Sequence, residues 1–432
     1  MVDTLRADVA VAGGGPAGVA AACRAAEAGA SVILIDEGLA PGGQVHRHLP
    51  GEEPPAGARR WLARLRRSGA RVVPSAAIFD AERDGPVWLL RVLKGENVLF
   101  VHAPRLVVAT GARELYLPFP GWTLPGVIGA GAAQALIRGG TNLNGRRAVV
   151  SGTGPLLLAA AAGLARAGAE VSIVAEQASF GRLAGFAGAA LRWPGKLLEG
   201  AGYRLAVARA PYRTGFWVKA AGGEGRVERA HVTDGRRKFE VACDLLCVGY
   251  GLVPNLELAR LIGCATRGPR LSAGDLQETN VPGVFAAGEV CGVAGADAAV
   301  AEGEIAGLAA ASALRPDDAA IRRLRTRRAR ARAFGELLTE AFRLRPEVLR
   351  LAASDTIVCR CEDVPLGRLP GSGSMRELKL RTRAGMGPCQ GRICGAALEA
   401  IRESGSDTVR VPVVPVPLEA LAAMEDDRRD SP

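Results

Sequence analysis

Short apolar runs separated by glycine-rich turns dominate the first 300 residues. Asp8–Ala12 and Ser31–Ile35 each predict a buried strand, and the small-residue stretch Gly18–Ala28 between them predicts a helix. A strand, a glycine turn, a helix and a second strand in this order form a βαβ unit, which builds a parallel sheet. The N-terminal pattern therefore predicts an α/β fold.

The turn of this unit reads Gly-x-Gly-x-x-Gly. Gly13 permits a tight turn, Gly15 permits close approach of the backbone to a pyrophosphate, and Gly18 permits helix–strand packing. The following helix offers unpaired N–H groups and the positive end of its dipole to phosphates. Asp36 lies near the separation of roughly 20 residues at which an acid binds a ribose hydroxyl. A glycine loop without a nucleotide is the alternative, but the two flanking strands favour a dinucleotide.

The same pattern occurs a second time. Arg147–Val150 and Val171–Ala175 predict strands on either side of a helix over Leu156–Ala167. Leu157 occupies the position of the third glycine, so this turn departs from the fingerprint. An acid at the end of the second strand favours NAD over NADP if a dinucleotide binds. The residues of this second nucleotide site are Gly152, Gly154, Pro155 and Glu176.

Two further apolar strands end in small residues. Arg105–Ala109 runs into Thr110-Gly111, where the backbone can pass close to a ligand. The apolar strand within residues 281–289 ends in Gly288-Glu289, whose acid can accept a hydrogen bond from a ligand hydroxyl. A common loop and a solvated acid at a helix start are the alternatives for these two segments.

Composition narrows the class of protein. A chain of 432 residues predicts two to four compact units, and 48% hydrophobic with 23% charged residues exclude a disordered polymer. The net charge of +11 is concentrated between Arg315 and Arg350, which holds eleven arginines. No nucleic-acid-binding motif accompanies this stretch. We therefore predict a solvated helix or a face for an acidic partner subunit, and no nucleic-acid partner.

The N-terminus and the apolar runs predict the compartment. The first eight residues are short and polar, so they do not resemble a secretory signal, and no apolar run reaches the roughly 20 residues of a membrane helix. The expected location is cytoplasmic, with membrane association only through partners. Nine cysteines in such a chain argue against a disulfide framework. Cys243 and Cys247 are expected to be core residues on one face of a strand.

Four cysteines near the C-terminus have the spacing of metal ligands. Cys359 and Cys361 form a Cys-x-Cys pair, and Cys389 and Cys394 form a Cys-x4-Cys pair. Four thiolates suit either zinc or an iron–sulfur cluster, and spacing alone leaves both open. The glycines around Cys389 favour [2Fe–2S], because they allow backbone N–H groups to turn toward cluster sulfurs.

The glycine motifs together resemble the flavoproteins with two dinucleotide-binding domains, which include glutathione-reductase-like and rubredoxin-reductase-like enzymes. This resemblance covers about residues 5–315 and implies FAD in the first fold. Disulfide reduction is not expected, because no Cys-x-x-Cys or Cys-x4-Cys pair precedes residue 359. The implied FAD-binding residues are Gly13, Gly15, Pro16, Ala17, Gly18, Asp36, Glu37, Gly43, Gln44, Thr110, Gly111, Gly288 and Glu289.

The cysteine motifs are similar to the bacterioferritin-associated-ferredoxin-like [2Fe–2S] domain. The whole chain resembles the flavin subunits of opine oxidases, hydrogen cyanide synthase and hydroxyproline or proline dehydrogenases, in which this domain is fused to a two-domain flavoprotein. The resemblance implies a discontinuous FAD-binding domain over 1–112 and 251–315, and an inserted second dinucleotide-binding domain over 113–250. A basic helical connector (316–352), a [2Fe–2S] domain (353–415) and a tail (416–432) follow.

These features predict an FAD-dependent oxidoreductase subunit that passes electrons between the flavin and a [2Fe–2S] cluster. The resemblance implies a heteromeric amine or amino-acid dehydrogenase or oxidase that acts on opines, glycine or proline-type imino acids. It also implies a smaller flavoprotein partner, and a further candidate partner is a small ferredoxin-like protein. The second fold leaves open an adenine nucleotide, NAD or ATP. The alternatives are an NAD(P)H-dependent reductase that delivers electrons through its cluster and a metal-binding scaffold. No residue is assigned a catalytic role.

Overall fold

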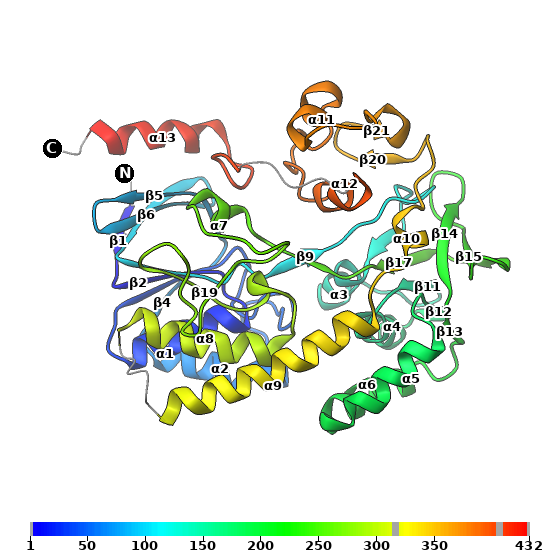
Figure 1. The fold of residues 1–432 in the computed structure, drawn as a ribbon, viewed down its shortest axis with the longest axis horizontal. Helices are drawn as coiled ribbons and strands as arrows, with labels where there is room; N and C mark the ends of the chain where they lie inside the picture. Colours follow the sequence, from blue (N-terminus) through cyan, green and yellow to red (C-terminus); the bar gives the residue numbers. More distant parts are fainter. Residues whose placement is uncertain (1–2, 313–318, 403–408, 430–432) are drawn as a thin grey trace. The chain divides into compact units, whose positions relative to one another are not determined.

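The chain forms two compact units in a computed structural model that describes residues 3–312, 319–402 and 409–429 (Figure 1). Unit 1 combines residues 1–113, 253–335 and 408–432, and unit 2 combines residues 114–252 and 336–407. The predicted domain boundary between residues 315 and 316 lies outside the described residues. Both units contain a five-stranded parallel sheet with helices, so the predicted α/β class is confirmed.

Unit 1 is built on a parallel sheet between a layer of helices and a second sheet. Its strands, in the order β19-β8-β2-β3-β4, are β2 (Val9–Ala12), β3 (Val32–Ile35), β4 (Arg71–Val73), β8 (Arg105–Val108) and β19 (Val284–Ala286). Helices α1 (Pro16–Glu27), α2 (Ala56–Arg67) and α8 (Ala296–Ala310) cover one face (Figure 1). Successive side chains of a strand point to opposite faces of the sheet, so β2 contributes to two cores. Val9 and Val11 pack beneath the helices, and Ala10 and Ala12 pack on the other face.

The second sheet of unit 1 has the order β1-β7-β6-β5. Its strands are β1 (Asp3–Arg6), β5 (Ala76–Asp84), β6 (Val87–Lys94) and β7 (Asn97–Ala103), of which only the β1–β7 pair is parallel. The C-terminal helix α13 (Leu418–Arg429) and the residues before it pack on this sheet, where Val413 N donates to Phe79 O. The segment predicted as a tail thus completes a core of unit 1. The unit also contains α7 (Glu257–Leu261) and the short helix η2 (Glu289–Cys291).

Unit 2 repeats the parallel architecture. Its five-stranded sheet, in the order β10-β17-β11-β12-β13, contains β10 (Val127–Gly129), β11 (Arg147–Gly152), β12 (Glu170–Glu176), β13 (Tyr212–Thr214) and β17 (Leu245–Gly249). Its helices are α3 (Ala130–Arg138), α4 (Pro155–Arg166), α5 (Phe180–Ala189), η1 (Ala190–Arg192) and α6 (Pro194–Ala206). An antiparallel sheet of β14 (Trp217–Gly222), β15 (Arg229–Thr233) and β16 (Lys238–Ala242) packs beside it. The short strands β9 (Ala112–Glu114) and β18 (Leu252–Pro254), at which the chain passes from one unit to the other, pair with each other.

The cysteine-rich end of unit 2 forms a small core of its own. It contains α10 (Pro346–Leu349), β20 (Ile357–Cys359), β21 (Val364–Pro365), η3 (Leu366–Arg368), α11 (Met375–Thr382) and α12 (Gly395–Arg402). Cys359 and Cys394 are buried with apolar residues of these elements. The Trp122 indole N–H donates to Ile357 O at 2.6 Å, which ties the strand before Cys359 to the rest of the unit.

The two cysteines near β17 differ from expectation in one respect. Cys243 and Cys247 are both fully buried, as expected of core residues, but they lie in different cores and not on one face. The reason is that β17 begins only at Leu245, so Cys243 precedes the strand and does not follow its alternation. Among the residues that the structure describes, no helix is both long and apolar enough to cross a membrane.

Candidate cofactor sites

The first glycine turn joins β2 to α1, and its three glycines meet different surroundings. A Cβ atom on Gly13 would lie 2.4 Å from Ala109 O, and one on Gly18 would lie 1.8 Å from Gly13 O. Gly13 also has a φ of 107°, which disfavours other residues. A Cβ atom on Gly15 would meet nothing within 4 Å. Gly13 and Gly18 are therefore required by the fold itself, whereas Gly15 faces open space.

The start of α1 is arranged to accept an anion. Gly15 is the N-cap residue and provides no side-chain cap, and Pro16 occupies the first turn. The first turn contains no acidic side chain that would compete with a bound phosphate. The positive end of the helix dipole, beside Ala17 and Gly18, thus faces the open space over Gly15.

Asp36 supplies an unsatisfied acceptor at the end of β3. Its Oδ2 atom is buried and has no hydrogen-bond partner. Burial raises the pKa of the Asp36 carboxyl group, an effect that the backbone N–H groups of Gly14, Gly38 and Glu37 oppose. A buried acceptor without a partner is costly unless a ligand donates to it. The neighbouring Glu37 side chain is exposed.

The loop after β3 lies against the glycine turn. Gly42 N donates to Gly14 O at 2.7 Å, and a Cβ atom on Gly43 would lie 2.8 Å from the Gly15 Cα atom. The Gln44 side chain accepts a hydrogen bond from Arg47 Nη2 at 2.7 Å. The structure thus places Gly43 next to the turn that the sequence predicts to bind FAD.

Thr110 and Gly111 follow β8 and are fixed by a residue that sequence reasoning did not identify. Thr110 Oγ1 donates to Asn255 O, and Asn255 Nδ2 donates to Thr110 O, both at 2.8 Å. Arg113 holds the same side chain by donating to Asn255 Oδ1 at 2.8 Å. The Thr110 hydroxyl group therefore has a structural partner, and Asn255 determines the position of this strand end.

The Gly288-Glu289 turn after β19 is held by two further residues that the sequence did not single out. Gly288 N donates to Glu302 Oε2 at 2.9 Å, and Glu302 is only 1% exposed. Arg332 Nε donates to Glu302 Oε1 at 2.5 Å, and its Nη1 atom donates to Gly292 O at 2.9 Å. Burial raises the pKa of Glu289, and the Arg332 charge opposes this rise. Arg332 belongs to the arginine-rich helix α9 (Ala319–Ala341), so this helix stabilises the turn.

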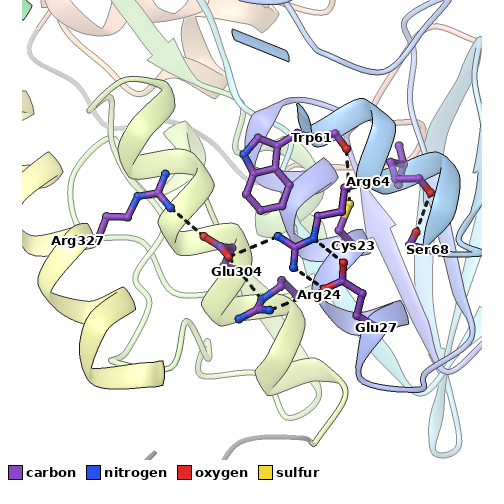
Figure 2. Close-up of polar contacts among 9 residues, drawn as sticks. Cys23, Arg24, Glu27, Trp61, Arg64, Ser68, Glu304 and Arg327 are labelled. Carbon is purple, nitrogen blue, oxygen red and sulfur yellow. Dashed lines mark hydrogen bonds and ion pairs between the residues drawn. The ribbon is translucent and has the colours of Figure 1, made fainter. Parts of the chain in front are cut away.

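Other arginines of α9 make similar contacts within unit 1. Glu304, which is almost buried on α8, lies 3.0 Å from Arg327 Nη1 and 3.5 Å from Arg24 Nε (Figure 2). Arg64 of α2 pairs with both carboxylate oxygens of Glu27, and its Nη1 atom lies 4.0 Å from Glu304 Oε1, so it links the two acids (Figure 2). The basic stretch is partly exposed, as expected of a solvated helix, but Arg327 and Arg332 also have partners within this chain. Buried acids on α8, separated from α9 in sequence, bind them.

The second glycine turn, between β11 and α4, differs from the first. A Cβ atom on Gly152 would lie 1.9 Å from Gly249 O, so the fold requires this glycine as it requires Gly13. Leu157 is fully buried in the core beneath the turn. Thr153 N donates to Gly249 O at 2.7 Å, and Pro155 has no N–H group. The turn has the predicted shape, but its backbone donors already have partners.

Glu176 is also satisfied from within the fold. The side chain is fully buried, and its carboxylate accepts from Gly154 N and Ala178 N at 2.8 Å and lies 2.9 Å from Thr153 Oγ1. Burial raises the pKa of Glu176 to about 7, and these hydrogen bonds and the Arg182 charge oppose the rise. The acid predicted to bind a ribose hydroxyl group is thus engaged by the glycine turn. Tyr212 is the other titratable group close to it.

The raised pKa of Glu176 predicts a specific dependence of stability on pH. Because the folded-state pKa lies above the usual 4.5, the folded chain retains a proton that the unfolded chain loses between pH 4.5 and 7. The contribution of Glu176 to the free energy of unfolding is present at low pH and is lost as the pH rises through about 7. Between pH 5 and 8, the unfolding free energy of the wild type should therefore fall by about 2–3 kcal/mol more than that of Glu176→Gln.

Denaturant unfolding monitored by tryptophan fluorescence at several pH values measures this difference. Glu170→Gln is the matched control, because Glu170 begins the same strand β12 but is exposed. The control should run parallel to the wild type over the whole range. A Glu176→Gln curve that is also parallel to the wild type would show that Glu176 is ionised throughout this range.

The four C-terminal cysteines form two contacting pairs in unit 2. The Cys359 thiol contacts that of Cys394, and the Cys361 thiol contacts that of Cys389. Cys359 and Cys394 are 1% and 3% exposed, whereas Cys361 is exposed. Within the described residues, no group of three or more His, Cys, Asp or Glu side chains has the arrangement of a site for a single metal ion. The Cys394 thiol also interacts with Cys389 and the Cys361 thiol with Cys359, so the two pairs lie near each other.

Backbone N–H groups point toward these sulfurs. Gly385 N donates to Cys359 Sγ at 3.4 Å. Burial alone would raise the pKa of the Cys389 thiol, but the N–H groups of Ile393, Gly391 and Arg392 and the Cys361 thiol together lower it. A Cβ atom on Gly387 would lie 2.3 Å from the Cys361 Cβ atom, so only glycine allows this loop to approach. The local chemistry thus favours a thiolate at Cys389, whereas burial raises the pKa of the Cys394 thiol.

Comparison with known proteins agrees with the fold. Residues 7–303 match the family model described as pyridine nucleotide-disulphide oxidoreductase. The chain is 34% identical to hydrogen cyanide synthase subunit HcnB of Pseudomonas aeruginosa, over 95% of this chain and 97% of that protein. It is 32% identical to an opine oxidase subunit of Rhizobium meliloti, over 96% of this chain and 98% of that protein. In structure it is similar to L-proline dehydrogenase from P. horikoshii, with a TM-score of 0.69, 20% identity, and coverage of 98% of this chain and 80% of that one.

The chain therefore belongs to the pyridine nucleotide-disulphide oxidoreductase family, and it is an FAD-dependent oxidoreductase.

Proposed function

We propose that this chain is the flavin- and cluster-bearing subunit of a heteromeric amine or amino-acid dehydrogenase or oxidase. In this proposal electrons pass between FAD at the first glycine turn and a [2Fe–2S] cluster at the four C-terminal cysteines. The observation that carries it is the pairing of four thiols, Cys359 with Cys394 and Cys361 with Cys389, surrounded by backbone donors in a chain of flavoprotein fold.

The residues of the first fold fit FAD. Gly15 leaves room for the pyrophosphate, the start of α1 provides N–H groups for it, and the unpartnered Asp36 Oδ2 atom would accept from a ribose hydroxyl group. The loop with Gly43 and Gln44 and the strand ends at Thr110-Gly111 and Gly288-Glu289 would line the rest of the cofactor. When bound, FAD supplies two-electron redox chemistry, and the protein contributes position and electrostatics.

Gly15→Ala tests the FAD site without disturbing the fold. The new methyl group meets no protein atom within 4 Å, and the φ of −70° suits alanine. We expect the apo-chain to be unchanged or up to about 1 kcal/mol more stable. A methyl group in the pyrophosphate position should cost about 1–3 kcal/mol, so FAD should bind about 10- to 100-fold more weakly. Flavin content after dialysis and FAD titration of the apo-chain measure this change.

Gly185→Ala is the matched control for this substitution. Gly185 lies in α5, and a Cβ atom there also meets nothing within 4 Å, but it is remote in sequence from every predicted FAD residue. The control should retain full flavin. Unaltered FAD affinity in Gly15→Ala would mean that the pyrophosphate does not lie over Gly15.

The C-terminal residues fit a [2Fe–2S] cluster better than a single zinc ion. Such a cluster takes two thiolate ligands on each of two irons, which matches two thiol pairs, whereas zinc takes four ligands around one centre. Backbone N–H groups directed at Cys359 and Cys389 stabilise negative charge on cluster sulfurs. When bound, the cluster supplies one-electron transfer, so the chain would couple two-electron and one-electron chemistry.

The names of the relatives support the quaternary part of the proposal. Two of them are subunits of hydrogen cyanide synthase and opine oxidase, and the chain is similar to each over nearly its whole length. We infer a smaller flavoprotein partner, which would oxidise an opine, glycine or proline-type substrate. A small ferredoxin-like protein is a further candidate partner. In this arrangement the present chain relays electrons.

Purification of the chain from its own host with its partners tests this function. We expect about one FAD, two irons and two labile sulfides in each copy of this chain, a paramagnetic signal after reduction, and a smaller flavoprotein in the same complex. Anaerobic addition of opines, glycine or proline should bleach the flavin in the complex and reduce the cluster. Zinc in place of iron, or a chain that purifies with flavin and without a partner, would contradict the proposal.

A further inference from the structure

The second glycine turn has a neighbour that the first turn lacks, namely the chain segment after α9. This segment, Phe342–Arg345, belongs to unit 2 and connects α9 to α10. Thr153 Oγ1 lies 3.1 Å from Phe342 O, between the two glycines of the turn. The Phe342 ring lies 3.9 Å from the position of a Cβ atom on Gly154. The segment therefore covers the turn at the start of α4.

Several side chains of the fold hold this segment in place. Gln177 Nε2 donates to Arg343 O at 3.3 Å, and Gln177 Oε1 accepts from Arg345 N at 3.1 Å. Arg345 Nε donates to Gln177 O at 2.7 Å, and its guanidinium group lies over the Trp217 ring. Arg182 Nη1 donates to Arg343 O at 3.0 Å. These contacts fix the backbone of the segment as well as its side chains.

The electrostatics of the segment resemble those of a bound anion. Helix α9 ends at Ala341, and the carbonyl groups beyond it form the negative end of its dipole. They face the start of α4, where the dipole is positive and a pyrophosphate would bind. A phosphate group at the start of α4 would meet these carbonyl oxygens. The phosphate and the segment would therefore compete for the same side of the turn.

The donors and the acid that a nucleotide needs are engaged as well. Gly154 N donates to Glu176, and Thr153 N donates to Gly249 O. In the first turn, by contrast, Gly15 faces open space and Asp36 Oδ2 has no partner. The two folds share a topology and a proline at the start of the helix, but they differ in whether the turn and the acid are available to a ligand.

We propose that Phe342–Arg345 is an internal ligand of the second dinucleotide-binding fold and excludes NAD(H) and other adenine nucleotides from it. Binding would require the segment to leave, and the apparent dissociation constant rises by the inverse of the fraction of open chains. If about 1% of chains are open, nucleotides bind about 100-fold more weakly than to the open fold. Electrons would then enter this chain from a partner or substrate and not from NADH.

Titration of the purified holo-chain with NADH, NAD, ADP and ATP by calorimetry tests the proposal. We expect no saturable binding of any of these nucleotides up to about 1 mM. A dissociation constant of 1 mM corresponds to a binding free energy of only about −4.1 kcal/mol. Anaerobic NADH should leave the flavin oxidised, whereas dithionite should reduce it. Saturable binding in the micromolar range to wild-type chain, or flavin bleaching by NADH, would overturn the proposal.

The double substitution Gln177→Ala/Arg345→Ala is designed to release the segment while keeping every residue of the glycine turn and Glu176, although it also removes the hydrogen bond from Gln177 Nε2 to Thr153 Oγ1. We expect ADP, used as the probe, to bind this variant at least about 10-fold more tightly than the wild type. Arg350→Ala is the control, because Arg350 is an exposed arginine of the same connector. Hydrogen exchange at residues 342–345 shows whether the segment has been released, and FAD content shows that unit 1 is intact. A released segment with no gain in ADP binding would overturn the proposal, and it would leave the FAD and cluster assignments unaffected.

Discussion

Cys394→Ser should yield a chain that purifies without iron or labile sulfide but with its flavin. Cys394 is buried against Cys359 in a small core, so the serine hydroxyl group would take the position of the lost sulfur. Serine replaces a soft thiolate by a hydroxyl group, which is a poor ligand for an iron–sulfur cluster. Iron and sulfide analysis, visible absorbance and electron paramagnetic resonance of the reduced protein measure the loss.

Cys264→Ser separates loss of a ligand from loss of a buried thiol. Cys264 is buried in unit 1, and its Sγ atom lies 3.7 Å from Thr279 Oγ1, which a serine hydroxyl group can still reach. This variant should retain the full iron content and the full flavin content. If Cys394→Ser also kept its iron and sulfide, the cluster would have to be bound elsewhere, and the central observation of the proposed function would be lost.

Most of the first nucleotide fold could be predicted from sequence because its determinants are local. Gly13, Gly15, Gly18 and Asp36 lie in one βαβ unit, where each residue type has one conformational or electrostatic task. Neighbouring strands confirm the same pattern at β8 and β19. A local motif of this kind needs no knowledge of the rest of the chain.

The partners that hold the other strand ends could not be predicted, because they come from distant segments. Asn255, Glu302 and Arg332 bind the turns at Thr110 and Gly288 only after the sheet has formed. In the sequence, Arg332 is one of many arginines in a basic stretch, and nothing local distinguishes it from its exposed neighbours. Two acids, Glu302 and Glu304, among the small residues of α8 were the available signal, because buried acids need cationic partners.

The second nucleotide fold shows a different case, in which the motif is present but its turn and acid are engaged within the fold. Leu157 marks a departure from the fingerprint in the sequence, whereas the contact between Thr153 and Glu176 across the turn is visible only in the structure. The segment that covers them lies well over a hundred residues further along the chain. Sequence pattern identifies topology here, whereas the availability of hydrogen-bond donors depends on tertiary contacts.

Arg91→Met is expected to destabilise unit 1 by about 3–5 kcal/mol, for the same reason that buried acids need partners. Arg91 is fully buried in β6, where its Nη1 and Nη2 atoms donate at 2.6 Å to Asp80 and Glu82 of β5. Methionine preserves the stem of the side chain but leaves Asp80, which is 3% exposed, as an unpaired buried charge. Denaturant unfolding monitored by fluorescence, to which Trp88 of the same strand contributes, measures the loss.

Two further variants show whether the cost comes from the unpaired charge or from altered packing. Lys94→Met changes an exposed cation at the end of the same strand, and it should alter stability by no more than about 0.5 kcal/mol. Asp80→Asn/Arg91→Met removes both charges of the buried pair, so it should recover most of the loss, since a neutral pair does not carry the desolvation penalty of a lone carboxylate. If the double variant were as unstable as Arg91→Met, packing against Phe100 of β7 and not charge pairing would account for the buried arginine. Recovery would instead show that the sheet tolerates the volume of methionine and that Asp80 determines which residue can occupy position 91.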